Sequence, residues 1–181
     1  MRQKRFITII LALFLLAACT ATLFLSGCGD SSTASDLTIE GSDGEITLSA
    51  ARSSNKVDVT VRLTKNSGIN AMNLTLAYDT KVLTLTGMDE GKALSSLNLM
   101  TTNTKTEKGY AITPFKFDYM NASKNDTSTG VMFTLHFSVK KGAKGDTVVG
   151  LRYDDGKITS MSGGGLVKKR FAVKPAVITL S

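Results

Sequence analysis

The sequence has few of the residue types on which many protein functions depend. It contains no tryptophan, one histidine, two cysteines and two prolines among 181 residues. Two cysteines cannot form a disulfide scaffold, and together with one histidine they cannot supply an ordinary four-ligand structural zinc site. Two prolines also exclude a collagen-like chain or a proline-rich linker.

The arrangements typical of enzymes are missing as well. The 15 acidic residues form no recognisable acid/base pair of the kind that glycoside hydrolases need. The sequence has no phosphate-binding loop, no nucleophile elbow and no cluster of metal ligands. We therefore expect a non-catalytic protein without a cofactor.

The N-terminus has the pattern of a secretory signal. Three basic residues lie within residues 1–5, and the run Phe6–Leu25 is uncharged. The sequence LSGC, which ends at Cys28, resembles the lipobox of bacterial lipoproteins, in which the cysteine receives a lipid. LAAC, which ends at Cys19, matches the same pattern, and the run is also long enough for an uncleaved membrane helix. We favour lipidation at Cys28, because polar residues suited to a tether follow it.

This signal predicts how the chain is organised and where it lies. We expect a lipoprotein signal peptide at residues 1–27, the lipidated cysteine with a polar tether at 28–36, and one folded domain at 37–181. The domain would lie outside the cytoplasm, anchored by lipid to the bacterial cell membrane. Removing residues 1–27 takes away three basic and no acidic residues, so the formal net charge falls from +7 to +4. That charge gives no sign of nucleic-acid binding.

Beyond the tether, apolar and polar residues alternate in the manner of half-buried β-strands. Strands are expected at 46–50, 57–63, 69–78, 82–87, 110–117, 131–139, 147–153 and 171–180. Turn signals such as Asn66–Gly68 and Gly163–Gly165 separate them. A short helix is expected at Lys92–Leu99. The pattern predicts an all-β fold, a nine-stranded β-sandwich with jelly-roll topology.

The order of several motifs resembles the cohesin family, the sandwich modules of cellulosome scaffolds that bind dockerins. The matching segments are Leu76–Asp79 with Val82 and Leu83 (L-x-Y-D-x-x-V-L), Gly87–Gly91, the strand Gly130–Lys140 and the polar turn Lys141–Asp146. The resemblance extends over about Leu37–Leu180. It implies a cell-surface adaptor that tethers a dockerin-bearing or analogous protein to the envelope, in polysaccharide breakdown. We expect a monomer.

In cohesins the partner docks on one flat sheet face formed by the third, fifth, sixth and eighth strands. The residues that the resemblance implies for this face are Ala71, Asn73, Thr75, Ala77, Thr113, Lys116, Met132, Thr134 and His136. Type I members often carry an Asn and an Asp where this chain has Ala71 and Asn73, so one charged contact is missing. His136, as an interface histidine, would make binding depend on pH.

Calcium, if required, is expected on the partner. Asp154–Gly156 lacks the spacing and the glutamate of a calcium loop, and is expected to be a hairpin turn. Two other functions stay open. One is direct polysaccharide binding by a carbohydrate-binding module, with a small platform at Tyr110 and Tyr119. The other is a structural role in an envelope assembly that uses the same face.

Overall fold

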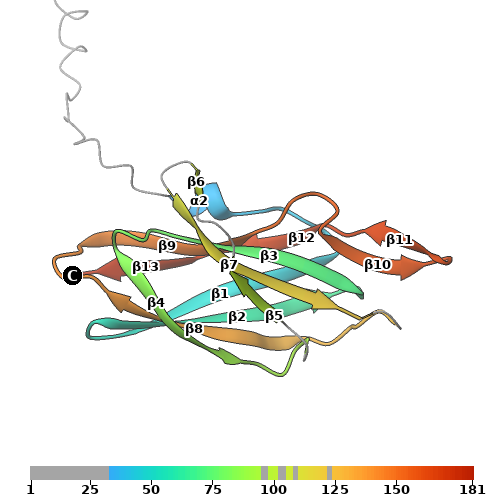
Figure 1. The fold of residues 1–181 in the computed structure, drawn as a ribbon, viewed down its shortest axis with the longest axis horizontal. Coiled ribbons are helices and arrows are strands. Elements are labelled where there is room, and N and C mark those ends of the chain that lie inside the picture. The colour runs from blue at the N-terminus through green and yellow to red at the C-terminus, as the bar shows by residue number, and fades with distance from the viewer. Residues whose placement is uncertain (1–32, 95–97, 102–104, 108–109, 122–123) are drawn as a thin grey trace, which may run out of the picture. The chain divides into compact units, whose positions relative to one another are not determined.

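The structure is a computed structural model. It describes residues 33–94, 98–101, 105–107, 110–121 and 124–181. These residues form two β-sheets and one short helix, α2 (Ala34–Leu37), so the expected all-β sandwich is confirmed (Figure 1). The expected signal peptide and both cysteines lie outside the described residues. In the described part of the chain, no helix is long and apolar enough to cross a membrane.

The first sheet has five strands, in the order β12–β1–β2–β8–β4. Their bounds are β12 (Phe171–Lys174), β1 (Gly44–Ser53), β2 (Lys56–Asn66), β8 (Gly130–Val139) and β4 (Leu83–Glu90). β12 runs parallel to β1, and the other pairs are antiparallel. Strand β2 lies in the centre, with β1 on one edge and β8 on the other, and its alternate apolar residues from Val57 to Leu63 are all fully buried on one side.

The second sheet has eight strands and is built around β3 (Ala71–Tyr78). One side of β3 pairs with β7 (Tyr110–Met120), and the other side pairs with β9 (Gly145–Arg152) and then with β10 (Ile158–Ser162). The outer strands are β5 (Asn98–Thr101) and β6 (Lys105–Glu107) on β7, β11 (Gly165–Lys168) on β10, and β13 (Ala176–Leu180) on β9.

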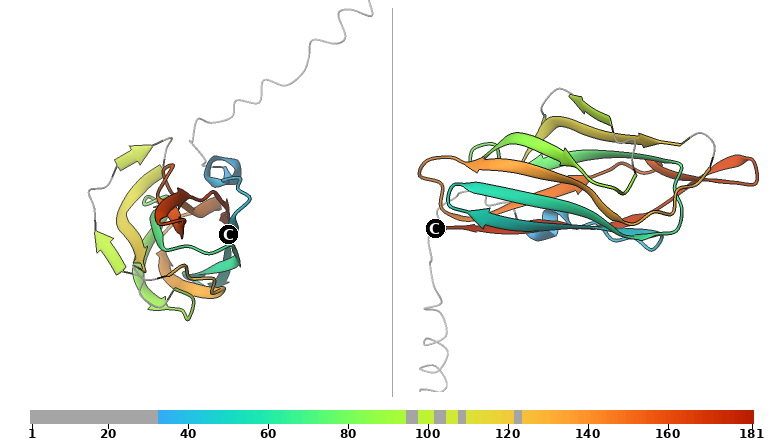
Figure 2. Two further views of the ribbon diagram at one scale, coloured as in Figure 1. Left: turned by 90° about the vertical axis from the view of Figure 1, so that its right-hand side faces the viewer. Right: turned by 90° about the horizontal axis from the view of Figure 1, so that it is seen from below.

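The hydrophobic core lies between the two sheets, which Figure 2 shows end-on in its left view. Met72, Leu74 and Leu76 of β3 belong to the same buried cluster as Phe133 and the other inward residues of β8. The aromatic rings of Tyr78 and Phe137 meet edge to face across this core, with centroids 5.0 Å apart. Alternation along the strands therefore predicted most of the core-facing residues; Met132 of β8 is an exception, since it was expected to point outward and is 1% exposed.

Several local expectations are wrong. In its described part, the segment expected as a helix at Lys92–Leu99 contains a bend at residues 92–94 and then the start of β5 at Asn98. The backbone N–H groups of Gly91 and Ala93 donate to carbonyls of β8, so this segment continues to follow a strand. The described residues also contain thirteen strands rather than nine.

Two connections explain part of the difference in the number of strands. Pro175 lacks an N–H and separates β12 from β13, which join different sheets. The turn at Asp154–Gly156 is present, with Gly156 at φ 76°, but it is not a hairpin. It joins β9 to β10, and both of these strands pair with the same side of β3.

Candidate docking surface

The outward residues of β3 form the centre of an exposed sheet surface. Ala71, Asn73 and Thr75 are partly exposed, and they alternate with residues that point into the core. The register extends this surface to both sides, because Thr75 lies opposite Arg152 of β9 and Ala71 lies opposite Thr159 of β10. We call Ala71, Asn73, Thr75, Arg152 and Thr159 the docking face.

Strand β7 borders the docking face on its other side. Its backbone register places Lys116 opposite Thr75, next to the docking face. Thr113 lies where the register between β3 and β7 shifts, beside Pro114, which cannot donate a ladder hydrogen bond. The side chains of Thr113 and Lys116 lie outside the described residues.

Ala77 was expected on the exposed surface, and the structure contradicts this. It points outward as the alternation predicts, but it is fully buried in a small cluster with Leu37 and Val148. The helix α2 places Leu37 over this end of β3. Gly150, which lies opposite Ala77 in register, makes room for Leu37: a Cβ on Gly150 would lie 2.9 Å from the Cβ of Leu37.

The structure does not bring Met132, Thr134 and His136 together with β3. Their strand, β8, lies in the five-stranded sheet, so Thr134 and His136 face the opposite side of the sandwich. Met132 is only 1% exposed. The register of β8 with β2 shifts at this residue, which turns its side chain into the core.

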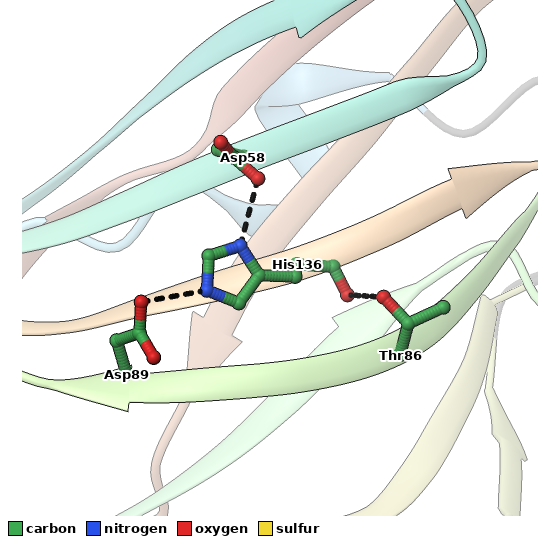
Figure 3. A network of polar contacts seen from close by, with 4 residues as sticks. All are labelled: Asp58, Thr86, Asp89 and His136. Carbon is green, nitrogen blue, oxygen red and sulfur yellow. Dashed lines mark hydrogen bonds and ion pairs between the residues drawn. The ribbon is translucent and has the colours of Figure 1, made fainter.

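His136 instead joins three strands of the five-stranded sheet (Figure 3). Its Nδ1 lies 2.8 Å from a carboxylate oxygen of Asp58 on β2, and its Nε2 lies 3.0 Å from one of Asp89 on β4. The hydrogen bonds to Asp58 and Asp89 raise the pKa of His136 above its usual value, because they favour the charged imidazolium. The two carboxylates contact different ring nitrogens, and the described residues contain no group of three or more metal-ligating side chains.

Sequence reasoning found His136 but neither of its partners. Asp58, Asp89 and His136 are far apart in the sequence, and only the register of β2, β8 and β4 brings them together. Asp89 lies beyond the strand expected at 82–87, whereas the structure places it within β4. No spacing in the sequence signals this cluster.

At the β10 end, the second sheet exposes large apolar side chains on its outer surface. Met120 lies opposite Ala71 and is 74% exposed. Met161 follows Thr159 on the outward side of β10 and pairs with Leu166 of β11, and these two side chains are 38% and 69% exposed. The sequence identified only the glycine-rich turn between Met161 and Leu166, because strand pairing and exposure cannot be read from that turn.

Polar contacts fix the position of these apolar residues. The side chain of Asn125 accepts a hydrogen bond from the N–H of Met161 at 2.7 Å and donates one to its carbonyl at 2.9 Å. The N–H of Asn70 donates to the carbonyl of Thr159, and the Thr159 hydroxyl donates to the side chain of Asn70. Both contacts lie on the edge of β10 that faces β3, because Thr159 and Met161 are two residues apart, and β11 pairs with the other edge.

Aromatic stacking on sugar rings finds little support. Tyr119 is 4% exposed, and its ring belongs to the core. Its hydroxyl donates to a carboxylate oxygen of Asp126 at 2.9 Å. The small platform expected at Tyr110 and Tyr119 therefore lacks one of its two rings, and the side chain of Tyr110 lies outside the described residues.

A two-sheet sandwich with an open sheet surface is an architecture that many binding modules share, so the family has to come from the sequence comparison. More specifically, the family model of the cohesin domain matches residues 44–164, so the chain belongs to the cohesin family. Cohesin domains are non-catalytic modules that bind dockerins. The resemblance seen in the sequence motifs is thereby confirmed.

Solved structures show the same fold. The seventh ScaB type I cohesin from Pseudobacteroides cellulosolvens is 22% identical over 76% of this chain and 92% of its own, with a TM-score of 0.52. The sixth cohesin of scaffoldin B from Acetivibrio cellulolyticus, solved with a mutant Cel5 dockerin, is 18% identical over 77% and 100%, with a TM-score of 0.51. A non-cellulosomal cohesin from Archaeoglobus fulgidus is 16% identical over 76% and 92%, with a TM-score of 0.50. No curated protein matches the chain.

Proposed function

We propose that this chain is a cell-surface adaptor that binds a dockerin-bearing protein on the docking face and tethers it to the envelope, in polysaccharide breakdown. The observation that carries the proposal is the cohesin-domain match over residues 44–164. Related cohesins solved in complex with dockerins support the choice of partner.

The geometry of the second sheet supports the choice of face. The side chains of Ala71 and Thr75 are short, so a partner helix can approach the backbone of β3 closely at these two positions. Asn73 and Arg152 supply polar groups beside these short residues. This mixture of close packing and polar contacts suits a specific interface, in which a few well-packed residues carry most of the affinity.

The N-terminus would supply the attachment. Lipidation at Cys28, after removal of residues 1–27, would join the domain to the membrane through the polar residues that follow. More than one acyl chain is needed for stable anchoring, and a triacylated cysteine meets that condition. The partner would bring any calcium that the interaction requires.

A matched pair of substitutions tests the docking face. Thr75→Lys changes the docking face, whereas Thr134→Lys makes the same change at a partly exposed position of the opposite sheet. With residues 29–181 as the immobilised protein and dockerin modules of the host organism as the probes, we expect Thr75→Lys to weaken binding about 30-fold or more, as at an interface hot spot. Thr134→Lys should leave the affinity within about twofold, as expected outside the interface.

The same experiment can overturn the proposal. Equal affinities for Thr75→Lys and the unchanged protein would exclude this face, and a loss with Thr134→Lys alone would move the site to the other sheet. Failure to bind any dockerin, with retention on insoluble polysaccharide, would favour a carbohydrate-binding module instead.

A further inference from the structure

The outer surface of the eight-stranded sheet is covered at one end by the chain's own N-terminal segment. Leu37 of α2 lies over Ala77 of β3 and Val148 of β9, and these three side chains are between 0% and 2% exposed. They form a cluster of their own, separate from the core between the sheets. Leu37 therefore closes this part of the outer surface to solvent.

Local contacts hold this segment in place. The N–H and the hydroxyl of Thr33 both donate to a carboxylate oxygen of Asp36, at 3.2 and 2.9 Å, and the hydroxyl of Thr38 donates to the carbonyl of Ala34. Ile39 then exchanges two backbone hydrogen bonds with Val173 of β12. A helix of four residues has no stability of its own, so its position depends on these contacts and on the packing of Leu37.

The other end of the same surface is open and apolar. Met120, Met161 and Leu166 are exposed there, and the side chain of Asn125 fixes the backbone of Met161 by accepting a hydrogen bond from its N–H and donating one to its carbonyl. The docking face lies between the covered end and this open end. The surface is therefore asymmetric along β3, because apolar area is closed at Ala77 and available beside Ala71.

We propose that α2 is an intramolecular cover that excludes a partner from the Ala77 end and directs it to the open end, where its apolar side chains pack on Met120, Met161 and Leu166. This inference rests on the proposed function, since the partner is the dockerin. It specifies that the partner uses the open end of the sheet, and that Leu37 of this chain limits the area that the partner can contact.

Cysteine labelling tests the cover without any partner. Residues 29–181 contain no cysteine and include the whole described domain with its core, so one introduced thiol is unique. Ala77→Cys should react with a maleimide at least tenfold more slowly than Thr75→Cys, its outward neighbour on β3. Adding Leu37→Ser should remove this difference. Leu74→Cys, which faces the core, should stay unreactive in every background and so shows that the fold is intact.

A second variant removes the cover without changing α2. Gly150→Ala places a methyl group 2.9 Å from both the Cβ and the Cδ1 of Leu37, so the helix must move away from the sheet. It should raise the labelling rate of Ala77→Cys as Leu37→Ser does. Labelling of Ala77→Cys as fast as Thr75→Cys in the otherwise unchanged chain would overturn the cover.

Dockerin affinity tests the directing role. Met161→Lys changes the open end, whereas Val177→Lys changes a side chain that is 51% exposed and lies opposite Val148, beside the cover. We expect Met161→Lys to weaken binding at least tenfold and Val177→Lys to leave it unchanged. Equal losses, or a loss with Val177→Lys alone, would overturn the directing role. If neither the unchanged chain nor Leu37→Ser binds a dockerin, both the proposed function and the directing role are wrong. The cysteine labelling would still show whether α2 covers Ala77.

Discussion

The contact of His136 with two carboxylates predicts a specific dependence of stability on pH. Because the pKa of His136 is raised in the folded state, folding favours the protonated imidazole. This stabilisation is fully present below the unfolded pKa of about 6.5, and it is lost as the pH rises through the higher folded value. Replacing His136 with glutamine removes the titration and keeps a polar side chain of similar length.

The magnitude follows from the exposure of the three side chains. His136, Asp58 and Asp89 are 33%, 56% and 79% exposed, so water and salt screen both contacts. Exposed ion pairs contribute about 0.2–1 kcal/mol each, and we expect about 1 kcal/mol for the two together. With a denaturant slope of about 2 kcal/mol per molar urea, this amounts to a midpoint shift of about 0.5 M.

Urea unfolding of residues 29–181 between pH 5.5 and 8.5 measures this effect. His136 is the only histidine, and this part of the chain has no cysteine, so no other side chain has an ordinary pKa in that interval. The unchanged protein should be more stable than His136→Gln at pH 5.5, and the difference should shrink toward pH 8.5. Asp58→Asn and Asp89→Asn should each remove part of it. Parallel curves for the unchanged protein and His136→Gln would refute the reasoning.

Three further substitutions test the packing of the sandwich by thermal or urea unfolding. The hydroxyl of Tyr153 donates to the carbonyl of Phe171 and accepts from its N–H, at 2.6 and 2.8 Å, so Tyr153→Phe leaves two backbone groups unpaired and should cost about 1–3 kcal/mol; an unchanged midpoint would contradict this. A Cβ on Gly91 would overlap the carbonyl oxygen of Val131, so Gly91→Ala should cost about 1–3 kcal/mol. Gly87→Ala in the adjoining strand meets only the ring edge of His136, at 3.7 Å, and should stay within about 0.5 kcal/mol. Equal costs for the two glycine substitutions would contradict the overlap.

The sequence by itself determined the fold class and the core side of most strands. Alternation is a local property, because successive side chains of a strand point to opposite sides. It therefore identified the inward residues of β3 and the buried aromatic residues of β8. The motif around Tyr78 and Asp79 pointed to the cohesin family, which the match over residues 44–164 then showed.

Only the tertiary structure decided which strands are neighbours and what covers them. Alternation predicts that a residue points outward, but it does not predict the sheet to which its strand belongs. Thr134 and His136 were therefore placed beside Thr75, although β8 lies in the other sheet. It also correctly placed Ala77 outward but could not show that Leu37, 40 positions earlier in the sequence, covers it. Both outcomes depend on contacts between distant segments, and a local pattern of side chains carries no information about such contacts.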